Sequence, residues 1–143
     1  MNNEFSRYDV FAKQMVDSYP KMFSSHFGGF AVGEGWWPIL KSLCANIQNH
    51  IDWKQEQKEK YGRGEGCEQL VVRQIKEKFG GLRFYYEGGD EYIAGMVRMA
   101  ENWAYSSCEE CGAPGKIRHG GWVRTLCDVH EAERQKKEQE MDS

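Results

Sequence analysis

The chain has 143 residues, of which 40% are hydrophobic and 13% aromatic, and its formal net charge is −3 at pH 7. This length and apolar content predict one folded domain, with a small metal-stabilised lobe as the exception, and they exclude a chain that is disordered throughout. Because basic and acidic residues are spread evenly over both halves of the chain, the overall charge does not indicate nucleic acid or an anionic membrane as a partner.

The N-terminal part of the chain contains two helical patterns separated by a loop. Apolar residues recur every three or four positions over residues 5–19, which predicts a first helix that Pro20 ends. Residues 24–35 are rich in glycine and have no period, so they are predicted to form a loop. Pro38 suits the first turn of a second helix, which is predicted over residues 38–60 with a charged end that extends into solvent.

The middle of the chain changes from a helical period to an alternating one. Residues 69–87 contain two β-rich runs joined by Gly80 and Gly81, and this pattern predicts a β-hairpin. Asp90 is then well placed as the N-cap of a third helix, which is expected to finish near Ser107.

Two pairs of metal-ligand residues follow the third helix. Cys108 and Cys111 form a C-x2-C pair, and Cys127 and His130 form a C-x2-H pair. The intervening residues 112–126 are long enough for a short β-hairpin and little else. Thiolate and imidazole donors at this spacing suit a tetrahedral Zn²⁺ ion. The pattern therefore predicts a zinc ribbon, which is a β-hairpin with a metal-binding turn at each open end, holding one structural zinc per chain.

Two other interpretations of this region involve His119. His119 could replace His130 as the fourth ligand, although it lies near the predicted hairpin turn. A metal-dependent nuclease would use His119 on the hairpin and further polar ligands on a following helix, but no His or Asn follows His130. A zinc ion with four protein ligands has no open position for chemistry, so a structural role is favoured and no catalytic residue is predicted.

The start of the chain and its cysteines indicate the cellular compartment of the protein. The first twenty residues lack a signal-peptide core and no long apolar run follows, so a cytoplasmic protein without a membrane segment is predicted. In a reducing compartment the five cysteines do not form a disulfide framework. Cys44 lies on the apolar face of a helical pattern and is predicted to be a small buried hydrophobic residue. Cys67 lies in a glycine-rich segment and has no predicted role.

Together these elements predict an α+β fold. Two N-terminal helices, a β-hairpin and a third helix form a core over residues 1–107. Residues 108–143 form the zinc-ribbon lobe, packed beside the hairpin as one compact unit with the core. The charged tail over residues 131–143 is either a solvated helix or a frayed end.

A candidate binding surface is predicted on the two hairpins, where cations could hold phosphates while bases stack on aromatic rings. Its residues are Arg73, Lys76, Arg83, Tyr85, Trp122 and Arg124. Trp36 and Trp37 follow two glycines and could add a ligand slot or a partner-binding edge. The alternative is a half-buried sheet with solvated charges, and a tryptophan pair that packs a helix start against the core.

Three blocks of the sequence resemble a group of small proteins encoded by tailed phages and prophages. The blocks are residues 35–40, residues 74–86, and the Cys108–Cys111 pair with residues 121–122 and 125–127. Members of this group generally close the second metal-binding turn with Cys, so His130 is a conservative departure. The resemblance implies that the protein acts in the cytosol of a bacterial host and that its partner is a host protein. Nucleic-acid-guided defence complexes are among the possible partners of such proteins. The resemblance implies no mechanism.

The predicted function is that of a small non-enzymatic, zinc-stabilised binding protein of phage type that acts on a host protein. The first alternative is direct binding of nucleic acid or a nucleotide through a basic and aromatic surface, formed by Arg73, Lys76, Arg83, Tyr85 and Arg124. The second alternative, from another functional class, is a metal-dependent nuclease that uses His119.

Overall fold

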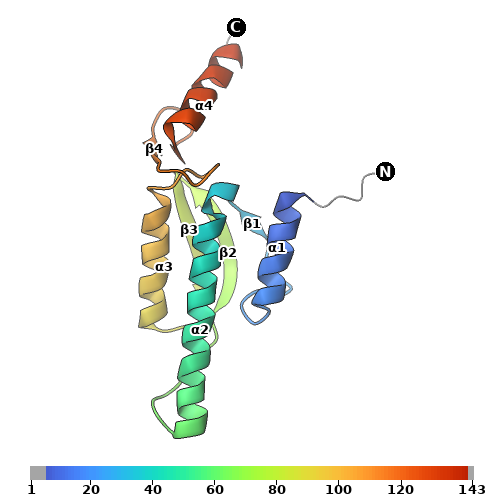
Figure 1. Ribbon diagram of the computed structural model, residues 1–143, viewed down its shortest axis with the longest axis vertical. Coiled ribbons are helices and arrows are strands. Elements are labelled where there is room, and N and C mark those ends of the chain that lie inside the picture. Colours follow the sequence, from blue (N-terminus) through green and yellow to red (C-terminus); the bar gives the residue numbers. More distant parts are fainter. Residues whose placement is uncertain (1–5, 142–143) are drawn as a thin grey trace, which may run out of the picture.

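The computed structural model describes residues 6–141 of the chain, which form an elongated α+β structure (Figure 1). The helices and strands follow in the order α1 (Arg7–Ser18), β1 (Phe30–Ala31), η1 (Glu34–Trp36), α2 (Trp37–Tyr61), β2 (Val71–Lys78), β3 (Gly81–Glu87), α3 (Glu91–Ala104), β4 (Lys116–Arg118), β5 (Arg124–Leu126) and α4 (Asp128–Met141). The predicted mixed α+β class is therefore confirmed. None of the helices formed by residues 6–141 is both long and apolar enough to cross a membrane.

The two predicted N-terminal helices are confirmed, and local signals explain where each begins. α1 starts at a capping box: the Ser6 hydroxyl accepts from the Asp9 N–H at 3.1 Å, and the Asp9 carboxylate accepts from the Ser6 N–H at 3.3 Å. α2 has Pro38 in its first turn and runs through the predicted charged end to its cap at Gly62. Phe5, the first residue of the predicted helix, lies outside the described residues.

The prediction of a plain loop over residues 24–35 is wrong in two places. β1 pairs in parallel with β2, with Phe30 opposite Ile75, and η1 occupies the end of the stretch. A two-residue strand has no period of its own, so no local pattern predicts it. It forms through long-range contacts, because the Phe30 ring packs edge-on against Phe11 and the Phe30 N–H donates to the Tyr8 hydroxyl at 2.7 Å.

The predicted β-hairpin is confirmed over β2 and β3, but its turn lies one residue earlier than predicted. Lys78 pairs with Gly81, so the two-residue turn consists of Phe79 and Gly80 rather than Gly80 and Gly81. Both turn residues have positive φ, 52° at Phe79 and 82° at Gly80, as a tight hairpin turn that follows the strand twist requires. Gly81 therefore belongs to β3.

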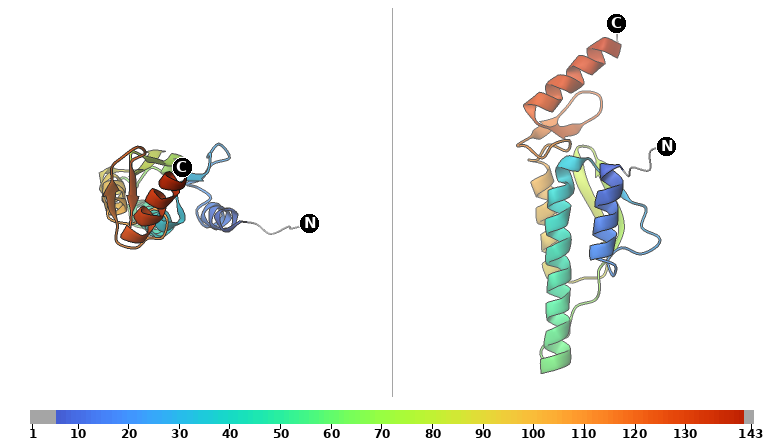
Figure 2. Two further views of the ribbon diagram at one scale, coloured as in Figure 1. Left: turned by 90° about the horizontal axis from the view of Figure 1, so that it is seen from above. Right: turned by 45° about the vertical axis from the view of Figure 1, so that its right-hand side comes forward.

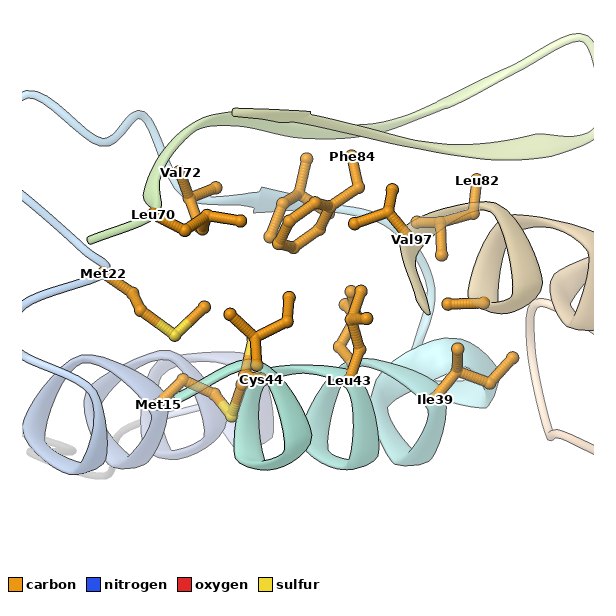
Figure 3. Close-up of a cluster of buried hydrophobic side chains, with 14 of the residues drawn as sticks. Met15, Met22, Ile39, Leu43, Cys44, Leu70, Val72, Leu82, Phe84 and Val97 are labelled. Carbon is orange, nitrogen blue, oxygen red and sulfur yellow. The ribbon is translucent and has the colours of Figure 1, made fainter. Parts of the chain in front are cut away.

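Helices α1, α2 and α3 cover one face of the sheet formed by β1, β2 and β3 (Figure 1), and the hydrophobic core lies between the two layers. Figure 3 shows Val72 and Phe84 pointing from the strands toward Leu43 and Cys44 of α2. Cys44 is fully buried, as predicted, and burial raises the pKa of its thiol to about 12. The sheet thus presents its apolar side to the helices.

The C-terminal lobe, residues 108–141, begins after α3 and carries a two-stranded sheet of its own. β4 and β5 form the short hairpin predicted within residues 112–126, and His119 and Trp122 lie in the loop that connects the two strands. The charged tail forms the helix α4, which projects away from the rest of the molecule (Figure 2). Of the two predicted alternatives for the tail, the solvated helix is therefore the correct one over residues 131–141.

Candidate metal centre

Three cysteines and one histidine gather where β5, α4 and the turn after α3 meet. Cys108 and Cys111 lie in that turn, Cys127 follows β5, and His130 lies in the first turn of α4. Their donor atoms all lie within 4.8 Å of one another, so the four residues could hold a metal ion. These are the four predicted ligands, whereas His119 is exposed in the loop between β4 and β5.

Three of the distances between the donor atoms lie between 3.2 Å and 3.8 Å. His130 Nδ1 lies 3.2 Å from Cys127 Sγ and 3.5 Å from Cys108 Sγ. Cys111 Sγ lies 3.8 Å from Cys127 Sγ. Donor atoms with such similar separations surround a common centre, from which one ion can reach all four.

Backbone N–H groups point at two of the sulfur atoms. The Ala113 N–H donates to Cys111 Sγ at 3.5 Å, and the His130 N–H donates to Cys127 Sγ at 3.4 Å. The bond from His130 has the largest effect on Cys127, and the pKa of that thiol is lowered. A lower pKa favours the thiolate, which is the form of cysteine that binds metals.

Two carboxylates face the opposite edge of the His130 ring. Glu110 Oε2 lies 3.5 Å from Nε2, and Glu133 Oε2 lies 4.0 Å from it. When Nδ1 binds an ion, Nε2 keeps its proton and can share it with a carboxylate, which holds the ring in orientation. Glu110 is the closer of the two, and it belongs to the same turn as Cys108 and Cys111. It therefore links the two halves of the cluster.

Ion pairs hold α4 against the second hairpin and so position His130. Arg118 pairs with Asp128 at 2.7 Å, and the hydrogen bond and charge of the guanidinium lower the pKa of that carboxyl. Arg134 pairs with the buried Glu131 at 2.8 Å and donates to the Trp122 carbonyl oxygen at 2.6 Å. The Arg118–Asp128 pair thus joins α4 to β4, and the Arg134 hydrogen bond joins it to the loop between β4 and β5.

Hydrogen bonds join the first cysteine turn to the residues that precede α2. The Gly35 N–H donates to the Glu109 carbonyl oxygen at 2.7 Å, and the Trp36 indole N–H donates to the Ser107 carbonyl oxygen at 2.9 Å. The Glu109 carboxylate accepts from the Gly33 N–H at 2.9 Å. Burial raises the pKa of this carboxyl, and the bond from Gly33 offsets part of the rise. The cysteine turn is therefore built directly against the core.

A second contact attaches the lobe to the turn of the first hairpin. The buried Thr125 hydroxyl, on β5, donates to the Gly80 carbonyl oxygen at 2.6 Å. Thr125 also accepts from the Glu109 N–H through its carbonyl oxygen at 3.0 Å. One residue of β5 thus connects the hairpin turn to the cysteine turn.

The tryptophan pair in the candidate binding surface lies largely inside the protein. Trp36 has 0% of its surface exposed, so its assignment to a binding surface is wrong. Trp37 is half-buried and stacks on Phe11, with the ring centroids 4.4 Å apart and the planes 4° from parallel. The pair packs the start of α2 against the core, which is the alternative that the sequence left open.

The arginines of the candidate binding surface already have partners within the chain. The pairs are Arg73 with Glu87, Arg83 with Tyr105, and Arg124 with Glu109 and Glu110. Lys76 is half-buried, with Nζ 5.8 Å from the Tyr85 ring centroid. Tyr85 and Trp122 are exposed, at 41% and 72%. The hairpin surface is therefore less cationic than its sequence indicates.

A groove between α2 and α3 was not predicted from the sequence. It has a volume of about 870 Å³, and large apolar side chains line it from both helices. Four of them are exposed by 47% to 73%, namely Trp53, Tyr92, Met99 and Trp103. The pattern of either helix alone does not show which of its apolar side chains stay exposed. The groove exists only because the two helices pack side by side over the sheet.

Comparisons of this chain with protein-family models, with curated proteins and with solved structures find no match. The resemblance to phage proteins therefore stays a prediction that rests on the three sequence blocks. The cluster of Cys108, Cys111, Cys127 and His130 and the exposed surfaces are the features that bear on function.

Proposed function

We propose that the protein is a small non-enzymatic binding protein, stabilised by one structural Zn²⁺ ion at Cys108, Cys111, Cys127 and His130. The observation that carries the zinc assignment is the spacing of the donor atoms. A tetrahedral ion with Zn–S bonds of about 2.3 Å and a Zn–N bond of about 2.05 Å separates two sulfurs by about 3.8 Å, and a sulfur from a nitrogen by about 3.5 Å. The distances here are 3.8 Å between Cys111 and Cys127 Sγ, and 3.2 Å and 3.5 Å from His130 Nδ1 to sulfur.

A structural role for this zinc is supported by the number of its ligands. Four protein donors complete a tetrahedron and leave no position for a substrate or an activated water. The nuclease alternative would need His119 beside further metal ligands. Within residues 6–141, His119 belongs to no group of clustered metal-ligating side chains.

Glu110→Gln is expected to weaken zinc binding by about tenfold, because the neutral amide holds the His130 ring less firmly than a carboxylate does. The affinity is measured by competition with a chromophoric chelator at constant pH. Glu133→Gln removes the same charge from the more distant carboxylate, so it serves as the matched control with a change of less than about twofold. Equal effects of both substitutions would contradict a specific role for Glu110.

The binding surface in this proposal is the groove between α2 and α3, and its occupant is the apolar face of a helix from another protein. Helix recognition commonly uses an elongated apolar groove with aromatic and methionine side chains along its rim. Trp53, Tyr92, Met99 and Trp103 supply such side chains here. The lining contains no Lys or Arg and one carboxylate, Glu91, so it suits an uncharged or weakly cationic segment rather than nucleic acid.

In the phage setting that the sequence resemblance implies, the partner is a host protein, and inhibition of a host defence complex is one such activity. Direct nucleic-acid binding by the hairpins is the weaker candidate. Arg73, Arg83 and Arg124 each have a partner within the chain, so phosphate binding would have to displace those contacts.

Met99→Glu is expected to abolish partner binding, because it places a charge on an exposed position of the apolar groove. Met141→Glu is the matched control: it makes the same substitution at the end of α4, where Met141 is 85% exposed. Wild type and both variants are used as bait in a bacterial lysate, and the captured proteins are quantified by mass spectrometry. The proposal predicts a saturable partner that wild type and Met141→Glu retain and Met99→Glu loses.

Two other outcomes would count against the groove. A partner captured equally by all three baits would place the binding surface elsewhere on the molecule. Binding to DNA or RNA with an affinity that falls steeply with salt would favour the hairpin surface instead, since such a slope reports counterion release from phosphates.

A further inference from the structure

A second group of metal-ligating side chains lies at the far end of the sheet from the cysteine cluster, within residues 6–141. It consists of His50 on α2, Cys67 in the segment between α2 and β2, and Asp90 at the N-cap of α3. One donor atom from each lies within 4.8 Å of the other two. His50 Nε2 lies 2.8 Å from Asp90 Oδ2, and Cys67 is 6% exposed.

The backbone brings Cys67 and Asp90 together by a close approach of two segments. Gly88 has φ 82°, and a Cβ at this position would overlap the Gln69 carbonyl oxygen. The next residue, Gly89, donates its N–H to the Glu68 carbonyl oxygen at 3.1 Å. The exit of β3 is thus bonded to the segment that leads into β2, and this contact sets the thiol beside the carboxylate.

The other two donors are held in orientation by neighbouring groups. Tyr92 stacks on the His50 ring, with centroids 4.5 Å apart and planes 14° from parallel. The second carboxylate oxygen of Asp90, Oδ1, accepts from the Ile93 N–H at 3.0 Å as the cap of α3. Oδ2 is therefore directed toward the imidazole, and neither side chain needs a new rotamer to meet an ion between them.

We propose that His50, Cys67 and Asp90 form a second metal site for a divalent transition-metal ion of the Zn²⁺ class. A nitrogen, a sulfur and an oxygen donor suit such an ion, whereas Ca²⁺ and Mg²⁺ prefer oxygen ligands alone. Three protein ligands leave a fourth position for water or an added ligand, unlike the closed C-terminal cluster. On binding, the ion takes the place of two protons. The thiol proton of Cys67 is released to solvent, and the proton between His50 Nε2 and Asp90 Oδ2 moves to Nδ1 of the neutral imidazole, so that Nε2 can bind the ion.

The rearrangement that this site requires is small. Two ligand atoms on a tetrahedral zinc ion with bonds of about 2.05 Å lie about 3.3 Å apart. His50 Nε2 and Asp90 Oδ2, now hydrogen-bonded at 2.8 Å, would therefore separate by about half an ångström. The local alternative is a pair of separate contacts, the His50–Asp90 hydrogen bond and the contact of the Cys67 thiol with the Glu68 carbonyl oxygen at 3.6 Å, whereas one metal ion would bind all three side chains at once.

The experiment uses the full chain, purified with its tightly held zinc and then titrated with Co²⁺ as the probe. Co²⁺ binds such ligands more weakly than Zn²⁺, so the filled C-terminal site keeps its zinc. Wild type is expected to take up one Co²⁺ per chain, with the charge-transfer absorption of a single cobalt–thiolate bond. Failure of wild type to bind Co²⁺ below the millimolar range would overturn the proposal without any variant.

Three substitutions locate the bound ion. Cys67→Ser and Asp90→Asn are expected to abolish Co²⁺ uptake, and Asn preserves the helix cap, so a loss there is not a folding defect. His119→Ala removes an exposed histidine and is the control that retains full uptake. Uptake that persists in both ligand variants would place the ion elsewhere and contradict the site.

The cobalt titration tests the second metal site independently of the zinc assignment at the C-terminal cluster. Cys111→Ser disrupts only the C-terminal cluster and is expected to leave the cobalt absorption that depends on Cys67 intact. If the C-terminal cluster bound no zinc at all, the Cys67-dependent uptake would still appear alone.

Discussion

Loss of the zinc ion is expected to unfold the C-terminal lobe while residues 6–107 stay folded. The lobe has a very small hydrophobic cluster of its own, formed by Cys108, Leu126 and Cys127 with Ala113 beside it. Two of these are metal ligands, so little apolar burial remains once the ion is gone. Structural zinc in units of this size contributes an apparent binding free energy of about 10–16 kcal/mol, which is also their folding free energy.

Cys111→Ser tests this expectation sharply, because Cys111 is exposed. Substitution of an exposed residue that has no special contact is usually close to neutral, so a large effect here cannot come from lost packing. We expect zinc affinity to fall by more than about a hundredfold. Hydrogen exchange should then show protection lost over residues 108–141 and retained in the core.

Metal analysis and reloading supply the controls for this prediction. Purified wild type should hold one zinc per chain after removal of loosely bound ions, and Cys111→Ser should hold none at the lobe. Chelator-treated wild type should lose protection in the same residues and regain it when Zn²⁺ is added back. A metal-free lobe that stays protected would show that the zinc interpretation of these four residues is wrong.

Gly35→Ala is expected to lower the free energy of unfolding by about 3 kcal/mol and to weaken zinc binding as well. A Cβ at Gly35 would lie 2.5 Å from Gly112 N and 2.7 Å from Cys111 N, and closer still to the Cys108 carbonyl oxygen. All three contacts are with backbone atoms, so no side chain can rotate out of the way. The cysteine turn must therefore move, and the Gly35 bond to the carbonyl oxygen of Glu109 stretches with it.

Gly95→Ala is the matched control for this substitution. Gly95 lies within α3, and a Cβ there would meet nothing within 4 Å. Alanine favours a helix interior over glycine by about 1 kcal/mol, so the control should be stabilising. Both variants are compared with wild type by urea denaturation and by zinc competition. Wild-type stability and zinc affinity in Gly35→Ala would mean that this packing contact is absent in solution.

Most secondary structure was predictable because its signals are local. The periodicity of α1, Pro38 at the start of α2 and Asp90 at the cap of α3 each act within one or two turns. The four candidate metal ligands were predictable for a similar reason. The two residues of each pair are close in sequence, and the segment between the pairs, residues 112–126, is too short to form more than a hairpin that brings the pairs together.

The mistaken predictions concern residues whose partners lie far along the chain. β1 has no pattern of its own and depends on pairing with β2. Trp36 was predicted to lie on a binding surface because glycines precede it. In the structure those glycines let the backbone of the cysteine turn approach within hydrogen-bond distance. The arginines of the hairpins were predicted to be available for a ligand, because the carboxylates and the hydroxyl that they contact are remote in sequence.

The sequence by itself determined the α+β class, the extent of the main helices, the first hairpin and the four residues of the C-terminal cluster. Only the tertiary structure decided which surfaces are open, how the lobe attaches through Gly35 and Thr125, and that His50 and Asp90 meet Cys67. The physical reason is the range of the interactions. Helix and strand preferences and ligand spacing act over a few residues, whereas burial and side-chain pairing depend on the packing of distant segments.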